Sequence, residues 1–258
     1  MHCFAFDIET IPDIESGRRL WDLGDLSDED VVTAMSFKRL QAAGTEFMPL
    51  HLHRIVAISV ALRTGDSFRV WSLGDPDADE AELVSRFFDG IEKFAPTLVS
   101  WNGSGFDLPV LHYRALLHGV SAPRYWEVGD TDRDFRYNSY LGRFHWRHID
   151  LMDVLSGYQP RGRAGLDDIA VMLGFPGKLG MSGDKVWNAW NAGDIDGIRN
   201  YCETDVLNTY LVYLRFELMR GRMTGKDLER EYERVRVTLT ESGESHFQEF
   251  LSAWQATG

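Results

Sequence analysis

Four acidic residues and one tyrosine carry the most informative chemistry in this sequence. Asp7 and Glu9 lie two positions apart, Asp107 lies far downstream, and Asp205 follows Tyr201 by one helical turn. Carboxylates that gather at one point repel one another unless cations lie between them. Sets of oxygen ligands favour hard divalent ions such as Mg2+ or Mn2+. If the fold gathers these acids, they predict a site for two divalent metal ions, which suits phosphoryl transfer.

The elements around the first three acids favour such a gathering. Asp7 and Glu9 belong to an apolar run that begins at residue 3 and predicts a strand. Side chains at positions i and i+2 leave a strand on the same face, so both carboxylates should point the same way. Asp107 follows a second apolar run, residues 97–101, at the start of an expected helix. Sites in open α/β sheets lie at strand ends, where we expect these acids.

The last acid lies in an expected helix of the C-terminal half. Tyr201 and Asp205 are four positions apart, and that spacing places the phenol and the carboxylate on one helix face. The whole chain predicts a mixed α/β sheet flanked by helices, with a helical C-terminal part. We expect one domain over residues 1–258, with a C-terminal helical extension from about residue 222.

The other expected elements follow from apolar periodicity and turn residues. Residues 11–50 look irregular, apart from a helix start near Ser27. Strands are expected at 54–63 and 67–73, and helices at 83–94, 108–118, 165–173, 195–221 and from 226 toward 254. Residues 149–155 fit either a final strand or a helix start.

Composition narrows the classes of partner. The net charge of −13 disfavours a protein that grips long duplex DNA through clustered basic residues. It does not exclude an enzyme that takes a strand end, because bound metal ions supply positive charge there. No apolar run reaches the ~20 residues that span a bilayer, and the first residues enter a strand pattern without a leader. With only Cys3 and Cys202, both expected in the core, we expect a cytoplasmic protein without a disulfide framework.

Basic and aromatic residues alternate between positions 124 and 163. The arginines are Arg124, Arg133, Arg136, Arg143, Arg147, Arg161 and Arg163, and the aromatic residues are Tyr125, Trp126, Phe135, Tyr137, Tyr140, Phe144 and Trp146. Such a mixture is typical of a path for single-stranded nucleic acid, which uses phosphate pairing and base stacking. The alternative is that the aromatic side chains are core and the arginines are their solvated neighbours.

Three motifs resemble those of the DEDD superfamily of 3′–5′ exonucleases. The resemblance rests on Phe6-Asp7-Ile8-Glu9-Thr10, on Asn102-Gly103-Ser104-Gly105-Phe106-Asp107 and on Tyr201-Cys202-Glu203-Thr204-Asp205. Because its third motif contains a tyrosine, the sequence resembles the DEDDy branch of this superfamily. The sequence is especially similar to bacterial stand-alone proteins related to the proofreading domain of family B DNA polymerases. The resemblance covers residues 3 to about 216 and implies a ribonuclease H-like fold.

The resemblance also implies roles for the acids. Asp7 would bridge two metal ions, Glu9 and Asp205 would complete the site that activates water, and Asp107 would hold the second ion. Tyr201 would orient the attacking water, because a phenol with an ordinary pKa near 10 is a poor base. For Asp107, a helix cap is the structural alternative.

Residues beside the acids are expected to bind substrate. By resemblance, Asn102 and Phe106 would help to place the terminal nucleotide. Thr10 would supply a backbone contact, and Ile11 would form an apolar wedge under the last base. Plain packing is the alternative for Ile11.

The implied activity is metal-dependent removal of nucleotides from the 3′ end of a single strand, with DNA favoured over RNA. A polymerase or a repair complex is an expected partner, and no membrane is. One alternative is a 3′–5′ exoribonuclease of the ribonuclease D type, which would use the same acids but recognise the 2′-hydroxyl. A second is a non-catalytic nucleic-acid-binding module on the same fold.

Several other polar residues are expected to play minor parts. We expect His51 and His53 to lie in a solvated loop, and Glu203 to be a helix-surface charge that faces away from Asp205. Asp150 and Asp153 are the best candidates for an additional acid at the site.

Overall fold

A mixed sheet of five strands forms the centre of the protein. The computed structural model describes residues 2–257, and the strand order is β3-β2-β1-β4-β5. The strands are β1 (His2–Pro12), β2 (His53–Thr64), β3 (Ser67–Ser72), β4 (Thr97–Ser100) and β5 (His148–Asp150). β1 pairs antiparallel with β2 and parallel with β4, which pairs parallel with β5. The carboxyl ends of β1, β4 and β5 therefore meet at one edge, where sites of α/β sheets form.

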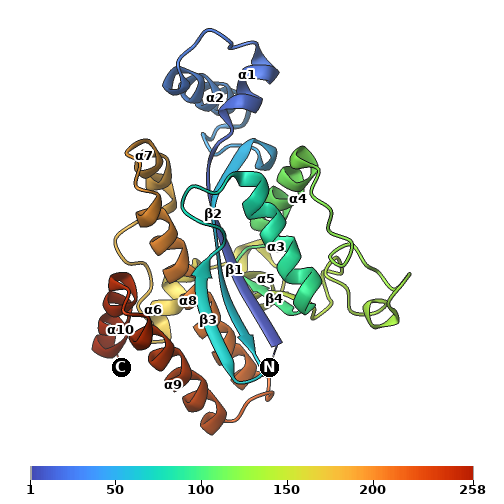
Figure 1. Ribbon diagram of the computed structural model, residues 1–258, viewed down its shortest axis with the longest axis vertical. Coiled ribbons are helices and arrows are strands. Elements are labelled where there is room, and N and C mark those ends of the chain that lie inside the picture. Colours follow the sequence, from blue (N-terminus) through green and yellow to red (C-terminus); the bar gives the residue numbers. More distant parts are fainter. Residues whose placement is uncertain (1, 258) are drawn as a thin grey trace.

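Helices cover both faces of the sheet (Figure 1). One face packs on α3 (Glu80–Phe94) and α4 (Asp107–His118). The opposite face packs on α8 (Ile195–Met219), which α6 (Leu166–Met172), α9 (Gly225–Ser242) and α10 (Ser245–Thr257) cover in turn. The shorter helices are α5 (Leu151–Leu155) and α7 (Val186–Asn191). This arrangement confirms the predicted ribonuclease H-like α/β fold with a helical C-terminal part.

Strand β1 directs alternate side chains to the two faces. Phe4 and Phe6 belong to the buried cluster under α3 and α4, whereas Cys3 and Ala5 belong to the cluster under α8. The small side chains on the second side let the long helix α8 lie close to the strand. Odd-numbered positions of β1 therefore face α8, and Asp7 continues that series.

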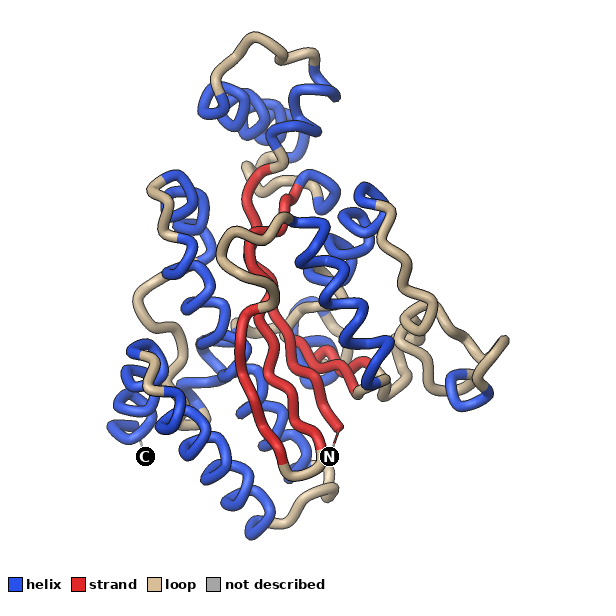
Figure 2. The backbone as a smooth tube through the Cα atoms, in the orientation of Figure 1, coloured by secondary structure: helices blue, strands red, loops and turns tan. Residues whose placement is uncertain are grey.

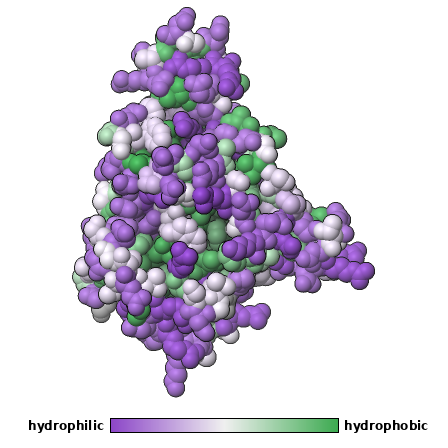
Figure 3. Space-filling view, in the orientation of Figure 1, coloured by the Kyte–Doolittle hydropathy of each residue, from purple (hydrophilic) through white to green (hydrophobic). Residues whose placement is uncertain are grey.

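Two predictions of local structure were wrong. Residues 11–50 contain α1 (Ile14–Trp21) and α2 (Asp28–Ala43), which form a helical hairpin beyond the end of the sheet (Figures 1 and 2). Ser27 caps α2, as its sequence suggested. The hairpin buries few apolar residues, α2 has almost no apolar periodicity, and hydrophilic residues dominate the visible surface of the hairpin (Figure 3).

The helix expected from 226 toward 254 is in fact two helices. Gly243 ends α9 in the left-handed conformation, with φ 73°. Glycine adopts this conformation at little cost, so the chain turns there and begins α10. The ambiguous stretch 149–155 contains both expected structures, because β5 ends at Asp150 and α5 begins at the next residue.

A buried ionic cluster joins the base of the helical hairpin to α3 and α4. Arg114 pairs with Asp13 at 2.5 Å and with Glu80 at 2.5 Å, and these three side chains are 4–5% exposed. Glu80 also accepts the backbone N–H of Ile55 and contacts His118. One guanidinium therefore neutralises two buried carboxylates from different elements.

Replacing Arg114 with Met should lower the free energy of unfolding by about 3–5 kcal/mol, because it leaves two buried charges unpaired. Urea denaturation followed by circular dichroism measures this loss. Arg86→Met is the matched control, since Arg86 pairs with Glu82 on the surface of α3, where the side chains are 53% and 43% exposed. That variant should lose less than about 1 kcal/mol. Equal losses in both proteins would contradict the assignment.

Candidate active site

Asp7 and Glu9 lie near the carboxyl end of β1. Asp7 pairs in register with Ser59 of β2, and Glu9 pairs with Ala57. A β-bulge follows directly between Glu9 and Thr10. Glu9 is buried and Asp7 is half-buried, so both carboxyls lie largely out of water.

Asp107 reaches the same place through a tight loop after β4. Asp150 holds this loop by accepting the backbone N–H groups of Asn102 (3.0 Å) and Ser104 (2.8 Å). Asn102 has φ 65°, and a Cβ on Gly103 would lie 2.2 Å from Ser100 Oγ, so this turn requires glycine there. The cap residue of α4 is Phe106 and not Asp107. Burial raises the pKa of the Asp107 carboxyl, whereas the backbone amide of Ile8 in β1 lowers it, so this carboxyl lies beside β1.

Helix α8 supplies the remaining two groups from the opposite layer. Tyr201 and Asp205 are both buried, and burial and the charge of Asp205 raise the pKa of the neighbouring phenol. Among the described residues, Asp205 Oδ1 is buried without a hydrogen-bond partner. The fold thus brings together the five side chains, although their roles remain predictions.

The electrostatics of the site follow from this crowding. Burial, followed by the charges of Asp107, Glu9 and Asp205, raises the pKa of Asp7 well above its usual value. Burial and the charges of Asp205 and Asp107 do the same to the pKa of Glu9. Burial also raises the pKa of Asp107 to about 7 and that of Asp205 to about 6. Without cations, these carboxyls resist ionisation at neutral pH.

The phenol of Tyr201 cannot serve as a base in these surroundings. Burial and the charges of Asp205 and Glu9 raise the pKa of Tyr201 far above its usual value. The hydroxyl therefore keeps its proton and can donate a hydrogen bond.

The donor set fits hard divalent cations. Ligand atoms of Asp7, Glu9 and Cys202 lie within 4.8 Å of one another, and Asp205 Oδ1 is an unused acceptor nearby. Burial and the charges of Asp7 and Glu9 raise the pKa of the Cys202 thiol, so it stays neutral. A neutral thiol is a poor metal ligand. The remaining donors are carboxylate oxygens, as Mg2+ and Mn2+ prefer.

Lys178 is a site residue that the sequence analysis missed. Its charge lowers the pKa of Glu9 and of Asp205. Asn208 holds the preceding Gly177 with hydrogen bonds to its N–H (3.3 Å) and its carbonyl (2.8 Å), and Asp167 accepts the N–H of Lys178 (2.7 Å). Asn208 lies three positions after Asp205 on α8. A polar residue at that spacing was the sequence signal that could have indicated a loop held against the site.

The predicted substrate-binding residues are placed differently from one another. Thr10 and Asn102 are half-buried at the ends of β1 and β4. Phe106 packs edge-on against His53, with ring centroids 5.0 Å apart. Ile11 is 2% exposed and lies in a buried cluster with Val186 and Ile198. This placement matches the packing alternative for Ile11.

Two expectations for other polar residues were wrong, those for Glu203 and His53. Glu203 is buried, where it accepts a hydrogen bond from Ser72 (2.7 Å) and contacts His246 (2.8 Å), because α10 and β3 cover that face of α8. His53 is buried at the start of β2 and contacts Thr10 at 2.9 Å. Asp150, a candidate for an additional acid, supports the loop before Asp107, and its charge adds to the effect of burial in raising the pKa of the Asp107 carboxyl.

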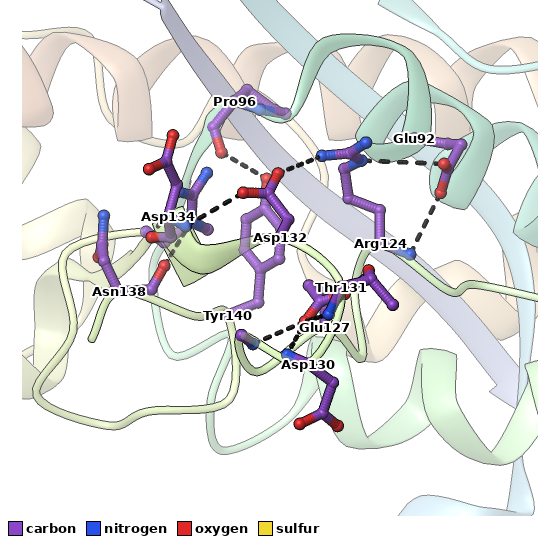
Figure 4. A network of polar contacts seen from close by, with 12 residues as sticks. Glu92, Pro96, Arg124, Glu127, Asp130, Thr131, Asp132, Asp134, Asn138 and Tyr140 are labelled. Carbon is purple, nitrogen blue, oxygen red and sulfur yellow. Dashed lines mark hydrogen bonds and ion pairs between the residues drawn. The ribbon is translucent and has the colours of Figure 1, made fainter. Parts of the chain in front are cut away.

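The stretch from 124 to 163 divides between core and surface. Tyr125, Phe135 and Tyr140 are buried, and the Arg147 guanidinium lies 3.8 Å from the centroid of the Phe135 ring. Tyr137 and Phe144 are 81% and 71% exposed. Figure 4 shows the polar contacts that hold the first part of this stretch. Part of the stretch is therefore core and part remains open to a ligand.

Comparison with known proteins adds an independent observation. Residues 45–254 match a family described as a predicted 3′–5′ exonuclease related to the exonuclease domain of PolB. The matched segment contains Asp107, Tyr201 and Asp205 but begins after Asp7 and Glu9. The fold brings those two acids to the others.

Distant relatives include DNA polymerases. The chain is 27% identical over 148 residues to the catalytic polypeptide of DNA polymerase epsilon from Saccharomyces cerevisiae, a match that covers 54% of this chain and 6% of that protein. It is 23% identical over 158 residues to a DNA polymerase of Archaeoglobus fulgidus, covering 60% of this chain and 19% of that protein. The chain thus corresponds to a small part of each relative. Among the described residues, the helices are too short or too polar to cross a membrane.

Replacing Asp107 with Asn should raise the melting temperature of the metal-free protein at pH 8 by roughly 5 °C, and change it little near pH 4. The folded pKa of Asp107, about 7, exceeds the ordinary value. The Asp107 carboxyl therefore does not reduce stability at low pH. Between about pH 4 and pH 7 this carboxyl ionises more readily in the unfolded chain than in the folded protein, so the free energy of unfolding falls as the pH rises. The side-chain amide of the Asp107→Asn variant carries no charge, so the variant avoids this loss of stability.

Thermal melts in a chelator at both pH values measure the effect, with Asp25→Asn on the exposed surface as the control. Added Mn2+ should stabilise the wild type more than the variant, because it binds the folded carboxylates. The same temperature difference at both pH values would refute the pKa assignment.

Proposed function

Because the chain belongs to the family of predicted 3′–5′ exonucleases related to the exonuclease domain of PolB, we propose a specific activity for it. The protein removes nucleotides from the 3′ end of single-stranded nucleic acid with the help of two divalent ions, Mg2+ or Mn2+. DNA is the preferred substrate. The distant relatives named as DNA polymerases favour DNA over RNA.

One observation carries this proposal. The carboxyls of Asp107 and Asp205 lie close enough to Asp7 and Glu9 to raise the pKa values of both, and one buried oxygen of Asp205 lacks a partner. A cluster of this kind destabilises a protein unless cations occupy it. Asp7, Glu9, Asp107 and Asp205 are therefore proposed as the metal ligands.

The proposed mechanism assigns each remaining group a task. Bound ions would stabilise charge on the phosphate oxygens and lower the pKa of the attacking water. Tyr201, whose phenol stays protonated, orients that water by hydrogen bonding. Lys178 adds positive charge beside Glu9 and Asp205, where the negative charge of a scissile phosphate would increase.

Residues of the two flanking strand ends would position the terminal nucleotide. Asp150 fixes the loop that carries Asn102 and leads to Asp107. Phe106 offers a partly exposed ring, and Thr10 offers backbone groups at the bulge of β1. Ile11 supports this bulge from the core. A rigid site of this kind limits the motion of the reacting phosphate.

Replacing Asp7 with Ala should reduce cleavage by about 10³-fold or more, because it removes the carboxylate at the centre of the ligand set. The assay uses 5′-labelled single-stranded DNA and the matched RNA with Mg2+ or Mn2+. The wild-type protein should shorten DNA from its 3′ end faster than RNA, and only with added metal.

Asp25→Asn serves as the control, since its exposed side chain lies away from the carboxyls. Faster cleavage of RNA would favour the exoribonuclease. Binding of either strand without any cleavage would favour a non-catalytic module. Full activity of the Asp7→Ala protein would exclude the proposed ligand set.

Replacing Lys178 with Met should lower kcat by ~10²-fold, because one positive charge beside the phosphate is lost. The KM for the strand should change less than kcat, since the effect falls mainly on the transition state. Steady-state cleavage of the same DNA measures both constants. Lys185→Met, an exposed lysine in the same region, is the control and should cleave normally; equal rates for the two variants would contradict this role.

A further inference from the structure

A cavity of about 430 Å³ lies beside the loop that carries Asp107. Ser104 and Gly105 of this loop form one wall, and residues of α4, α5 and the 140–143 segment form the others. Among the described lining residues, none of the four site carboxyls appears. The cavity and the site therefore share the loop but are separate spaces, both at the carboxyl ends of parallel strands.

The charged groups of the cavity neutralise one another. Asp150 accepts three backbone N–H groups, those of Asn102, Ser104 and Asp153. Asp153 is buried and pairs with Arg163 at 2.7 Å and with Arg143 at 3.4 Å. Both guanidinium groups thus pair with Asp153, whereas Asp150 is held by backbone N–H groups, and the described lining residues carry two negative and two positive side chains. A cavity with balanced charge suits a neutral polar ligand better than an anion.

One buried nitrogen in the cavity wall has no partner. Among the described residues, His112 Nε2 is buried without a hydrogen bond, although the ring packs on Tyr125 and Trp126. Burial lowers the pKa of His112 to about 4, so its imidazole is neutral at pH 7. In contrast, the neighbouring His148 Nε2 contacts Ser100 Oγ at 2.8 Å. An unused buried polar atom costs stability unless a ligand or water completes it.

Flat aromatic rings form the other walls. Tyr125 and Tyr140 are stacked, with centroids 5.6 Å apart and planes 5° apart. The Tyr140 hydroxyl donates to the carbonyl of Pro96 at 2.7 Å, which fixes this ring in the network of Figure 4. Tyr158 also lines the cavity and lies under the Arg143 guanidinium. These rings are held in place before any ligand enters.

We propose that this cavity binds one nucleobase. A base is planar, neutral and rich in hydrogen-bonding groups, which matches the tyrosine rings that line the cavity, the balanced charge and the unpartnered nitrogen of His112. Arg143, whose side chain is 54% exposed, lies at the cavity and can meet a phosphate attached to the base. The proposal rests on the proposed function, because it concerns the strand whose 3′ end lies at the carboxyls.

The base can come from two sources. It can belong to the strand, at a nucleotide a short distance 5′ of the one being removed, or to a released mononucleotide. Both offer the same chemistry to His112 and to the aromatic rings. Only the first would let the cavity contribute to holding the strand during successive cleavages.

The test measures binding in the Asp7→Ala protein, which keeps the cavity but should not cleave. A short 5′-fluorescent DNA strand is titrated with Mg2+ present, and abasic sites replace the bases one at a time from the 3′ end. His112→Phe keeps a ring and removes the unpartnered nitrogen. Tyr113→Phe, exposed on the same helix, is the matched control. Circular dichroism verifies that each variant is folded.

If the strand supplies the base, one internal abasic position should weaken binding by ~10-fold, beyond its neighbours. His112→Phe should weaken binding of the intact strand by ~5-fold, as expected for one lost hydrogen bond. In this variant, removing the base at the sensitive internal position should weaken binding less than it does in the parent protein, and the effects at other positions should not change. If a mononucleotide supplies the base, free dAMP or dCMP should instead bind in a His112-dependent manner.

Uniform abasic penalties together with no His112-dependent binding of mononucleotide would overturn the nucleobase proposal. In that outcome, cleavage of the intact strand by wild-type protein in the parallel assay would leave the exonuclease proposal standing. Failure of wild type to cleave and of the Asp7→Ala protein to bind would overturn both.

Discussion

The crowding of buried carboxyls at the end of β1 is the constraint around which the fold is arranged. Several buried acids elsewhere have arginine partners: Asp13 and Glu80 share Arg114, Glu231 pairs with Arg63 at 2.6 Å, and Asp153 pairs with Arg163. At the site, Lys178 is exposed on its loop and acts only through its charge. The same chain thus neutralises acids with arginine where structure requires it and omits arginine where cations could bind.

Holding repelling groups together requires rigid support from several elements. Burial raises the pKa of both Asp7 and Asp107, whereas the backbone amide of Ile8 lowers it, so the carboxyls of β1 and α4 both lie beside this amide. Helix α8 can approach β1 because Cys3 and Ala5 are small. Polar contacts then continue outward from Cys202 to Ser59, Ser72, Glu203 and His246 of α10. The C-terminal helices therefore contribute to the position of α8 and of its two site residues.

Much of this arrangement could be predicted from local patterns. The alternation of β1 indicates that Asp7 and Glu9 share a face, and the four-residue spacing on α8 aligns Tyr201 with Asp205. Neither pattern contains the tertiary contacts that set the environment of other residues. Glu203 looked like a surface charge because the packing of α10 on α8 is invisible in a helix pattern. The helical hairpin escaped notice because it buries little and has almost no apolar periodicity in α2.

Residues that act through loops were the hardest to predict, and Lys178 and His112 show why. The charge of Lys178 acts on the carboxyls from a loop that Asn208 and Asp167, from two different helices, hold in place. The helix pattern of α4 does not distinguish His112 from its neighbours. In the folded chain its ring packs on Trp126 of the segment after α4, and its Nε2 is buried without a partner. In both cases, the chemistry depends on segments that meet only in the folded chain. Sequence therefore identifies the acids that need a cation, whereas the fold identifies the groups that would meet the strand.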